Sequence, residues 1–302
     1  MKNDIIVVIS TYNGSKRIER QLDSIFKQED VSVSVFIRDD HSTDNTVELV
    51  RQYQKRTGYK IDIIEGENKG YARSFWDALC AAPKASFYAF SDQDDVWYKD
   101  KLIKSILAFE DATSLPQLTY CKMVRTDSAL TPLKEQVKVL TPDVLNKKLV
   151  LTQTFNYGAA TVINHAAKEL ICLHFPTNKL VPHDAWAGLL CYWFGKVNYV
   201  DESLYSWIRY ENSVTGAGTK LSGIKYRLKE TFNGKSYMNV AEDLLEHYSA
   251  YISEEDKVFL KKLISYKKKI SDKLFLLSDS EFKRSTFMGT LSLKFGILTN
   301  MF

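Results

Sequence analysis

Three acidic residues and a glutamine stand together where a short apolar segment of the chain ends. The apolar segment spans 86–90, and the cluster after it is Asp92-Gln93-Asp94-Asp95. Carboxylates about 4 Å apart repel one another by about 1 kcal/mol in water, and by more in a partly desolvated cleft. A divalent cation removes that repulsion, and oxygen ligands favour Mg²⁺ or Mn²⁺. We therefore predict a metal site at Asp92 and Asp94. The alternative is a solvated turn that caps the next helix.

Two more polar groups follow apolar segments nearer the start of the chain. The carboxylate of Asp39 can accept a hydrogen bond from the N3–H of uracil or thymine, and Asp40 stands beside it. The earlier group offers a hydroxyl, an aromatic ring and an amide that could hold a nucleoside, at Thr11, Tyr12 and Asn13. Each group also has a plain structural interpretation, because such residues often form turns and helix caps.

A third polar group follows the apolar segment 60–65 and contains Asn68, Lys69, Gly70 and Arg73. Glycine lets the backbone approach a ligand closely, and the two cations could contact phosphate. Taken alone, this group would be an ordinary exposed turn.

A single acidic residue in the second half of the chain is a candidate general base. Asp184 follows Pro182 and His183 at the start of a predicted helix. A carboxylate facing a metal-bound substrate could take a proton from an attacking hydroxyl. The same Pro-His-Asp sequence serves equally well to begin a helix.

The elements that must position these residues alternate in type along the first 97 residues. Apolar runs predict strands at 5–9, 31–38, 60–65 and 86–90, and apolar residues spaced three or four apart predict helices at 15–27, 44–55 and 71–82. Thr43 or Asp44 is the expected cap of the second helix. This order predicts an open, mostly parallel α/β sheet, in which ligands bind beyond the carboxyl ends of the strands. The polar groups should therefore form one site.

The second half of the chain is less regular. We expect strands at 118–125, 159–163, 197–200 and 204–209, and helices at 141–149, 164–174 and 183–194. Composition shifts near residue 218, after which lysine-rich helices are expected at 226–230, 240–251, 254–277 and 291–302. The predicted domains are a catalytic domain over 1–218, with halves 1–97 and 98–218, and a helical region over 219–302.

The lysine-rich tail has three interpretations. Its helices could pack on the rest of the protein with the lysines in water, which we favour. Alternatively, they could rest on an anionic membrane near a lipid-linked acceptor, or form an oligomer. The membrane interpretation depends on lysines interleaved with apolar residues in one segment: Lys257, Phe259, Leu260, Lys261, Lys262, Leu263, Ile264, Tyr266, Lys267, Lys268 and Lys269.

Composition limits the function classes. The chain has 302 residues with 41 basic and 37 acidic side chains, and a net charge of +4 argues against a nucleic-acid partner. Four widely spaced cysteines predict reduced thiols rather than a disulfide framework or zinc site. No signal peptide opens the chain, and no apolar run approaches the roughly 20 residues of a membrane-spanning helix. We therefore expect a soluble, cytoplasmic protein, with peripheral membrane contact as an open alternative.

The motifs at the predicted strand ends resemble those of family 2 glycosyltransferases with the GT-A fold, over about residues 4–215. They are Val7-Val8-Ile9-Ser10-Thr11-Tyr12-Asn13-Gly14, Arg38-Asp39-Asp40-His41-Ser42-Thr43-Asp44, Asn68-Lys69-Gly70 and Phe90-Ser91-Asp92-Gln93-Asp94-Asp95-Val96-Trp97. The last is similar to the rhamnosyltransferase-like branch that builds bacterial surface polysaccharides. That branch also has a His-Asp pair before a Trp-containing helix, as His183-Asp184-Ala185-Trp186 do here.

The resemblance implies roles for individual residues. Thr11, Asn13 and Asp39 would contact the base and ribose, Asp92 and Asp94 would hold the metal and diphosphate, and Asp184 would be the catalytic base. Tyr12, Asp40, Asn68, Gly70, Arg73 and Gln93 complete the predicted donor site. Two positions depart from the branch: Ser203 stands where Pro is expected, and Tyr210 where His is expected.

The expected reaction is a metal-dependent transfer of a sugar, with inversion, from dTDP-rhamnose or a UDP-hexose to a hydroxyl of a lipid-linked or protein-linked glycan. The competing classes are a nucleotidyltransferase and a non-enzymatic nucleotide-binding module, including a degenerate transferase that acts as a partner subunit. A dehydrogenase is disfavoured because no GxGxxG follows the first strand.

Overall fold

The computed structural model describes residues 4–110, 114–210 and 236–301, and these form two compact units. The first, here called the sheet unit, contains residues 1–142, 156–175 and 182–210. The second, the helical unit, contains residues 143–155, 176–181 and 211–302. The predicted boundary near 218 and the predicted helix at 226–230 lie outside the described residues.

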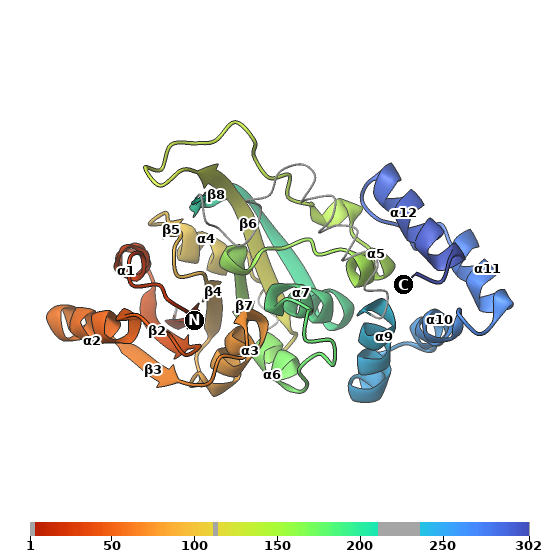
Figure 1. Ribbon diagram of the computed structural model, residues 1–302, viewed down its shortest axis with the longest axis horizontal. Helices are drawn as coiled ribbons and strands as arrows, with labels where there is room; N and C mark the ends of the chain where they lie inside the picture. Colours follow the sequence, from red (N-terminus) through yellow and green to blue (C-terminus); the bar gives the residue numbers. More distant parts are fainter. Residues whose placement is uncertain (1–3, 111–113, 211–235, 302) are drawn as a thin grey trace. The chain divides into compact units, whose positions relative to one another are not determined.

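The sheet unit is built on one mixed sheet of eight strands in the order β3-β2-β1-β4-β7-β6-β8-β5 (Figure 1). Strands β1 to β4 pair in parallel, while β7 runs antiparallel to both β4 and β6. The bounds are β1 Asp4–Thr11, β2 Ser32–Asp39, β3 Ile61–Glu65, β4 Phe87–Ser91, β5 Val96–Trp97, β6 Gln117–Thr126, β7 Thr161–Asn164 and β8 Lys196–Ile208. The predicted α/β sheet is confirmed, and its parallel part carries the first four polar loops.

Helices that connect the strands cover both faces of the sheet. They are α1 Ile18–Phe26, α2 Thr46–Thr57, α3 Tyr71–Ala81, α4 Lys101–Leu107, α6 His165–Cys172 and α7 His183–Phe194. The chain steps from β1 outward to β3 and then returns to β4. With right-handed crossovers this puts α3 on the face opposite α1 and α2. Helices α3, α6 and α7 lie together in Figure 1. The central strand is covered on both sides, because Val7, Val8 and Ile9 are fully buried.

Two local predictions in the sheet unit differ from the structure. The two strands expected at 197–200 and 204–209 are one strand, β8, whose pairing with β6 shifts register near Lys122. The exposed Asp201-Glu202 pair lies in the bulge at this shift, between the residues that pair with Cys121 and Lys122. The N-cap residue of α2 is Asn45, but its side chain makes no capping hydrogen bond. The Asp44 carboxylate accepts from the backbone N–H of Thr46, the first residue of α2, so of the two predicted caps Asp44 is the one that bonds the helix start. Asp44 also accepts from the backbone N–H of Ser15.

The helical unit contains α5 Lys147–Thr152, α9 Ser236–His247, α10 Glu254–Ser265, α11 Ile270–Ser278 and α12 Phe287–Leu298. The helix predicted at 141–149 starts later, at Lys147, where the Asn146 side chain caps it. The helix predicted at 254–277 is divided into α10 and α11, and the Ser265 hydroxyl bonds to Asp272 across the break at 2.6 Å. Among the described residues, no helix is long and apolar enough to cross a membrane.

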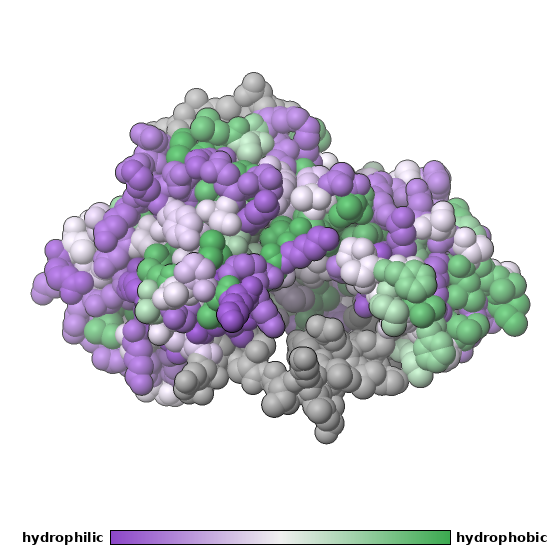
Figure 2. Space-filling model, turned by 90° about the horizontal axis from the view of Figure 1, so that it is seen from above, coloured by the Kyte–Doolittle hydropathy of each residue, from purple (hydrophilic) through white to green (hydrophobic). Residues whose placement is uncertain are grey.

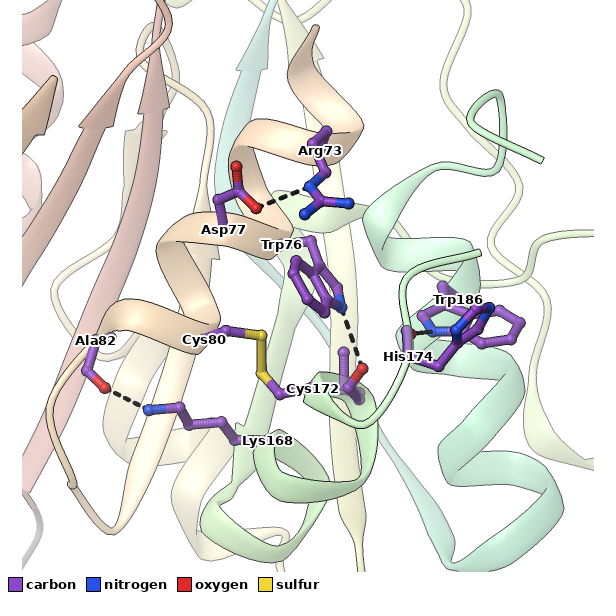
Figure 3. Close-up of a disulfide and its surroundings, with 10 residues drawn as sticks. Arg73, Trp76, Asp77, Cys80, Ala82, Lys168, Cys172, His174 and Trp186 are labelled. Carbon is purple, nitrogen blue, oxygen red and sulfur yellow. Dashed lines mark hydrogen bonds and ion pairs between the residues drawn. A yellow bond between two sulfur atoms is a disulfide. The ribbon is translucent and has the colours of Figure 1, made fainter. Parts of the chain in front are cut away.

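A disulfide joins the ends of two helices in the sheet unit, which the spacing of the cysteines did not predict. Cys80 at the end of α3 is bonded to Cys172 at the end of α6, 92 residues later (Figure 3). The Trp76 indole donates to the backbone carbonyl of Ile171 at 3.1 Å, so the two helix ends are also held without the sulfurs. Cys121 and Cys191 are free, buried thiols. The prediction that all four cysteines are reduced was therefore wrong, because pairing depends on packing rather than spacing.

Reduction of this disulfide should destabilise the protein. A cross-link that closes a loop this long removes entropy from the unfolded chain and typically contributes about 2–4 kcal/mol. We expect the free energy of unfolding, measured with urea, to fall by about that amount when reductant is added. A Cys80→Ala/Cys172→Ala variant should show no response to reductant. Equal midpoints for the wild-type protein with and without reductant would contradict the prediction.

Candidate active site

The loops that follow β1 and β2 are joined by short hydrogen bonds. The Thr11 hydroxyl donates to the Asp39 carboxylate at 2.7 Å, and the Asp40 backbone N–H donates to the Thr11 carbonyl at 2.8 Å. Asp39 also accepts from the hydroxyl and the backbone N–H of Ser42. A carboxylate has about four acceptor positions, so Asp39 retains room for one ligand donor.

Asn13 and Tyr12 lie at the turn of the first loop. Asn13 adopts a left-handed backbone conformation, with φ of 49°, and its amide oxygen accepts from the backbone N–H of Thr43 at 2.8 Å. This contact holds the first loop against the second. The Tyr12 ring is about half exposed, while its backbone is tied to the Gln93 amide by two hydrogen bonds, at 3.1 and 3.0 Å. Gln93 therefore links the first loop to the acidic loop after β4.

Asp40 is a buried clamp for the third loop. Its carboxylate is ion-paired with Arg38 and accepts from the backbone N–H groups of Lys69 and Gly70, both at 2.9 Å. Gly70 has φ of 80°, which favours glycine at this position. The Asp40 contacts fix the start of α3 and use the carboxylate internally.

Asn68 and Arg73 differ in how they are held. Asn68 is exposed. The Arg73 guanidinium is ion-paired with Asp77 at 2.8 Å and lies over the Trp76 and Phe175 rings. Figure 3 shows Arg73 with Asp77 and Trp76. A phosphate contact by Arg73 would have to compete with this ion pair.

The acidic cluster brings three carboxyl groups together with few cations beside them. Burial and the charges of Asp94 and Asp184 raise the pKa of Asp92 to about 7. The Asp94 carboxylate is paired with Arg17 at 3.1 Å, although burial still raises its pKa. Asp95 is buried and its pKa is raised well above the usual value, chiefly by burial and by the neighbouring Asp92. Behind it lies Lys101, fully buried, whose pKa burial lowers to about 8.

Asp184 reaches this cluster from the first turn of α7, 92 residues after Asp92. Its carboxylate accepts from the backbone N–H of Ala185 at 2.8 Å, and burial raises its pKa to about 6. The neighbouring His183 ring stacks on Phe75 with ring centroids 3.9 Å apart, and burial lowers the His183 pKa to about 3. His183 is therefore a neutral, packed side chain in the first turn of α7. The charge of Asp184, by contrast, acts on Asp92.

Three arginines near Asp94 were missed by the sequence analysis. The Arg17 guanidinium lies 3.7 Å over the Tyr210 ring, and Arg20 donates to the Tyr210 hydroxyl. Arg17, Arg20 and Arg209 all lower the pKa of Asp94 through their charge. Tyr210 thus anchors basic side chains beside the acidic loop, at the position where the related branch has histidine. In the sequence, Arg17 and Arg20 could have been recognised as site residues because they follow directly after the first loop.

The acidic residues fit a divalent cation. The Asp92 carboxylate has no hydrogen bond or ion pair to any of the described residues, and burial, together with the charges of Asp94 and Asp184, raises its pKa. Two carboxylates of this kind are hard oxygen ligands that suit Mg²⁺ or Mn²⁺. Asp92 and Asp94 would hold the ion, with Arg17 released from Asp94.

Comparison with known proteins gives the family. A family model described as glycosyl transferase family 2 matches residues 6–169, more than half of the chain. The chain belongs to glycosyl transferase family 2. Over 110 residues this family 2 chain is 41% identical to the dTDP-rhamnosyl transferase RfbG of Shigella flexneri. The aligned region covers 34% of this chain and 38% of that relative. An uncharacterized glycosyltransferase of Nostoc is 24% identical over 87% of the chain and 81% of its own length.

Solved structures support the GT-A fold of this family 2 chain. Staphylococcus aureus TarS, residues 1–349 in complex with UDP-GlcNAc, superposes with a TM-score of 0.59 at 19% identity, over 99% of this chain and 80% of the 1–349 chain. A Pyrobaculum calidifontis mannosyltransferase in complex with GDP-Man and Mn²⁺ has a TM-score of 0.53 at 16% identity, with the same coverage. The expected GT-A architecture with C-terminal helices is confirmed.

Proposed function

We propose that this chain is an inverting glycosyltransferase that moves a sugar from a nucleoside-diphosphate donor to a hydroxyl of a bacterial surface glycan. One observation carries the proposal: Asp184, in the first turn of α7, is close enough to the acidic loop at the carboxyl ends of the parallel strands for its charge to raise the pKa of Asp92. A base beside a diphosphate site is the arrangement that a single displacement requires. A nucleotide-binding scaffold without activity would have no use for Asp184 there, and a nucleotidyltransferase would release pyrophosphate.

In this proposal the chain's own residues divide the work. Thr11, Asn13 and Asp39 hold the base and ribose, with Tyr12 beside them. Asp40, Gly70 and Gln93 keep the donor loops in place, while Asn68 and Arg73 border them. Asp184 takes the proton from the acceptor hydroxyl, which attacks the anomeric carbon from the face opposite the leaving group. Arg17, Arg20 and Arg209 lie where they can balance charge on the released diphosphate.

The proposed cofactor is Mn²⁺ or Mg²⁺ at Asp92 and Asp94. When bound, the ion supplies Lewis-acid stabilisation of the leaving nucleoside diphosphate. The Asp92 carboxylate supports this proposal, because its charge is otherwise uncompensated among the described residues. The Mn²⁺ named for the mannosyltransferase of the same fold is consistent with it.

Two donor classes follow from the relatives. The relative from Shigella flexneri is named a dTDP-rhamnosyl transferase, whereas the solved TarS complex contains UDP-GlcNAc. We propose dTDP-rhamnose first, since the sequence match to that relative is 41%. We further propose that residues 1–97 form the half of the catalytic domain that binds the donor and that residues 98–218 form the half that binds the acceptor. Residues 219–302 form the helical region. We also propose that the protein acts in the cytoplasm, on a lipid-linked or protein-linked acceptor.

Calorimetric titration with UDP and with dTDP, each with and without Mn²⁺, tests the proposal. We expect metal-dependent binding of one of the two, with tighter binding of dTDP if rhamnose is the donated sugar. Asp62→Asn is a suitable control, because Asp62 is an exposed carboxylate near the amino end of β3, away from the carboxyl ends of the strands. Failure of both nucleotides to bind in the presence of Mn²⁺ would favour a degenerate partner subunit.

The pH dependence of turnover should identify the base. Asp184 has a pKa of about 6 and works only when deprotonated, so activity should be lost as the pH falls through 6. We expect kcat/KM to drop about tenfold per pH unit on that side and to level off above it. The measurement needs saturating Mn²⁺, because Asp92 has a pKa of about 7. An acid limb that moves with the Mn²⁺ concentration would assign it to Asp92 and contradict the assignment to Asp184.

A further inference from the structure

Helices α11 and α12 carry an apolar face that the described residues of the helical unit leave exposed. The most exposed side chains are Phe287 at 81%, Ile270 at 78% and Met288 at 69%. The face, here called the α11–α12 face, consists of Ile270, Leu274, Phe287, Met288, Leu291, Phe295 and Leu298. Figure 2 shows hydrophobic side chains gathered over these helices. An exposed apolar patch of this kind usually marks a binding surface.

The spacing shows that this face is one side of α12 rather than a set of scattered residues. Leu291, Phe295 and Leu298 recur at intervals of four and three, and Phe287 precedes them by four. The opposite side of α12 is buried, since Leu293 and Ile297 are fully buried. The helix is therefore apolar on both sides, and only one side is needed for packing inside the unit.

The two helices meet at a basic edge. The Lys273 ammonium donates to the Leu298 carbonyl at 3.2 Å, which sets the start of α11 beside the end of α12. Lys268 and Lys269, in the turn just before α11, are exposed. From Lys268 to the end of α12 the chain has six Lys and Arg against three Asp and Glu, a net charge of +3. No Asp or Glu lies within α12.

The α10 residues that first suggested a membrane surface do not provide it. Phe259, Leu260, Leu263 and Tyr266 are buried inside the helical unit. Their burial supports the packing interpretation for α10. The apolar surface left for a partner is that of α11 and α12.

The charge decides between the two partners that an apolar face could take. In a symmetric dimer through this face, a segment of net charge +3 would meet a copy of itself, and the like charges would repel. An anionic lipid surface attracts the same charges and accepts the apolar side chains. We propose that the α11–α12 face docks on an anionic membrane, with Phe287, Leu291 and Phe295 entering the interface and the lysines lying at the level of the headgroups. This proposal goes beyond the proposed transferase activity and is independent of it.

Vesicle sedimentation with the full chain tests the proposal without donor or acceptor. The vesicles contain either phosphatidylcholine alone or equal parts of phosphatidylcholine and phosphatidylglycerol. We expect binding to the anionic vesicles and little to the neutral ones. Phe287→Ser/Phe295→Ser should weaken binding by at least about tenfold, and Lys268→Ser/Lys269→Ser should weaken it and reduce its salt dependence.

Leu107→Ser is the matched control, because Leu107 is also strongly exposed but lies on α4 in the sheet unit. It should leave vesicle binding unchanged. Nucleotide titration and thermal melting of each variant establish that it is folded, and Leu291→Ser/Leu298→Ser replaces any variant that is not. The proposal is overturned if anionic vesicles are not bound, or if the serine variants bind them like the wild-type protein. A dimer in solution that Phe287→Ser/Phe295→Ser dissociates would also overturn it, in favour of a second copy as the partner.

Discussion

Asp184→Asn should lower turnover by about 10²–10⁴-fold while donor affinity stays within about twofold of the wild-type value. The substitution keeps the size of the side chain and its contact with the Ala185 backbone, but it removes the proton acceptor. Release of nucleoside diphosphate measures turnover, and calorimetry measures affinity. A loss confined to kcat is expected for a group that acts in the transition state alone.

The control for this variant is Asp62→Asn, which removes an exposed carboxylate from the same unit. It should have normal turnover. If Asp184→Asn keeps most of its activity, another base carries the reaction and the assignment fails. If it loses nucleotide binding as well, Asp184 supports the donor site instead of accepting a proton.

Asp92→Asn should have opposite effects on activity and stability. We expect activity to fall by about 10²-fold or more and Mn²⁺ to lose its effect on nucleotide binding, because a primary oxygen ligand becomes a weak one. The melting temperature without metal should rise at neutral pH. Burial and the charges of Asp94 and Asp184 disfavour the ionised form of Asp92, and the neutral amide removes that unfavourable interaction.

The pH dependence of stability gives this prediction a definite sign. Asp92 has a folded-state pKa of about 7 against a usual value of 3.8, so the folded protein binds more protons between these values. Its contribution to stability is therefore present at low pH and lost as the pH rises through 7. The stability gained by Asp92→Asn should grow over the same range. A variant that is less stable than the wild-type protein at neutral pH in the absence of metal would contradict this account.

Much of the site was predictable because parallel strands end at a common edge. Thr11, Asp39 and Asp92 each follow an apolar run, and the strand–helix alternation requires their loops to meet. The sequence did not separate residues that face a ligand from those that hold the loops. Asp40 and Gln93 look equivalent to Asp39 and Asp92 in sequence, yet their hydrogen bonds are to the backbone of neighbouring loops.

The α/β order, the polar loops at the strand ends and the family can be read from the sequence alone. These depend on local propensity and short-range periodicity, which can be seen within a few residues. The packing of distant segments was needed to show that the charge of Asp184 acts on Asp92, that Arg17 and Tyr210 lie together beside Asp94, and that Cys80 is bonded to Cys172. It also decided that α10 buries its apolar residues while α12 exposes one side. The physical reason is common to all of these. Periodicity shows that a face is apolar or that a group is charged, but the neighbour that covers or pairs with it comes from a distant part of the chain.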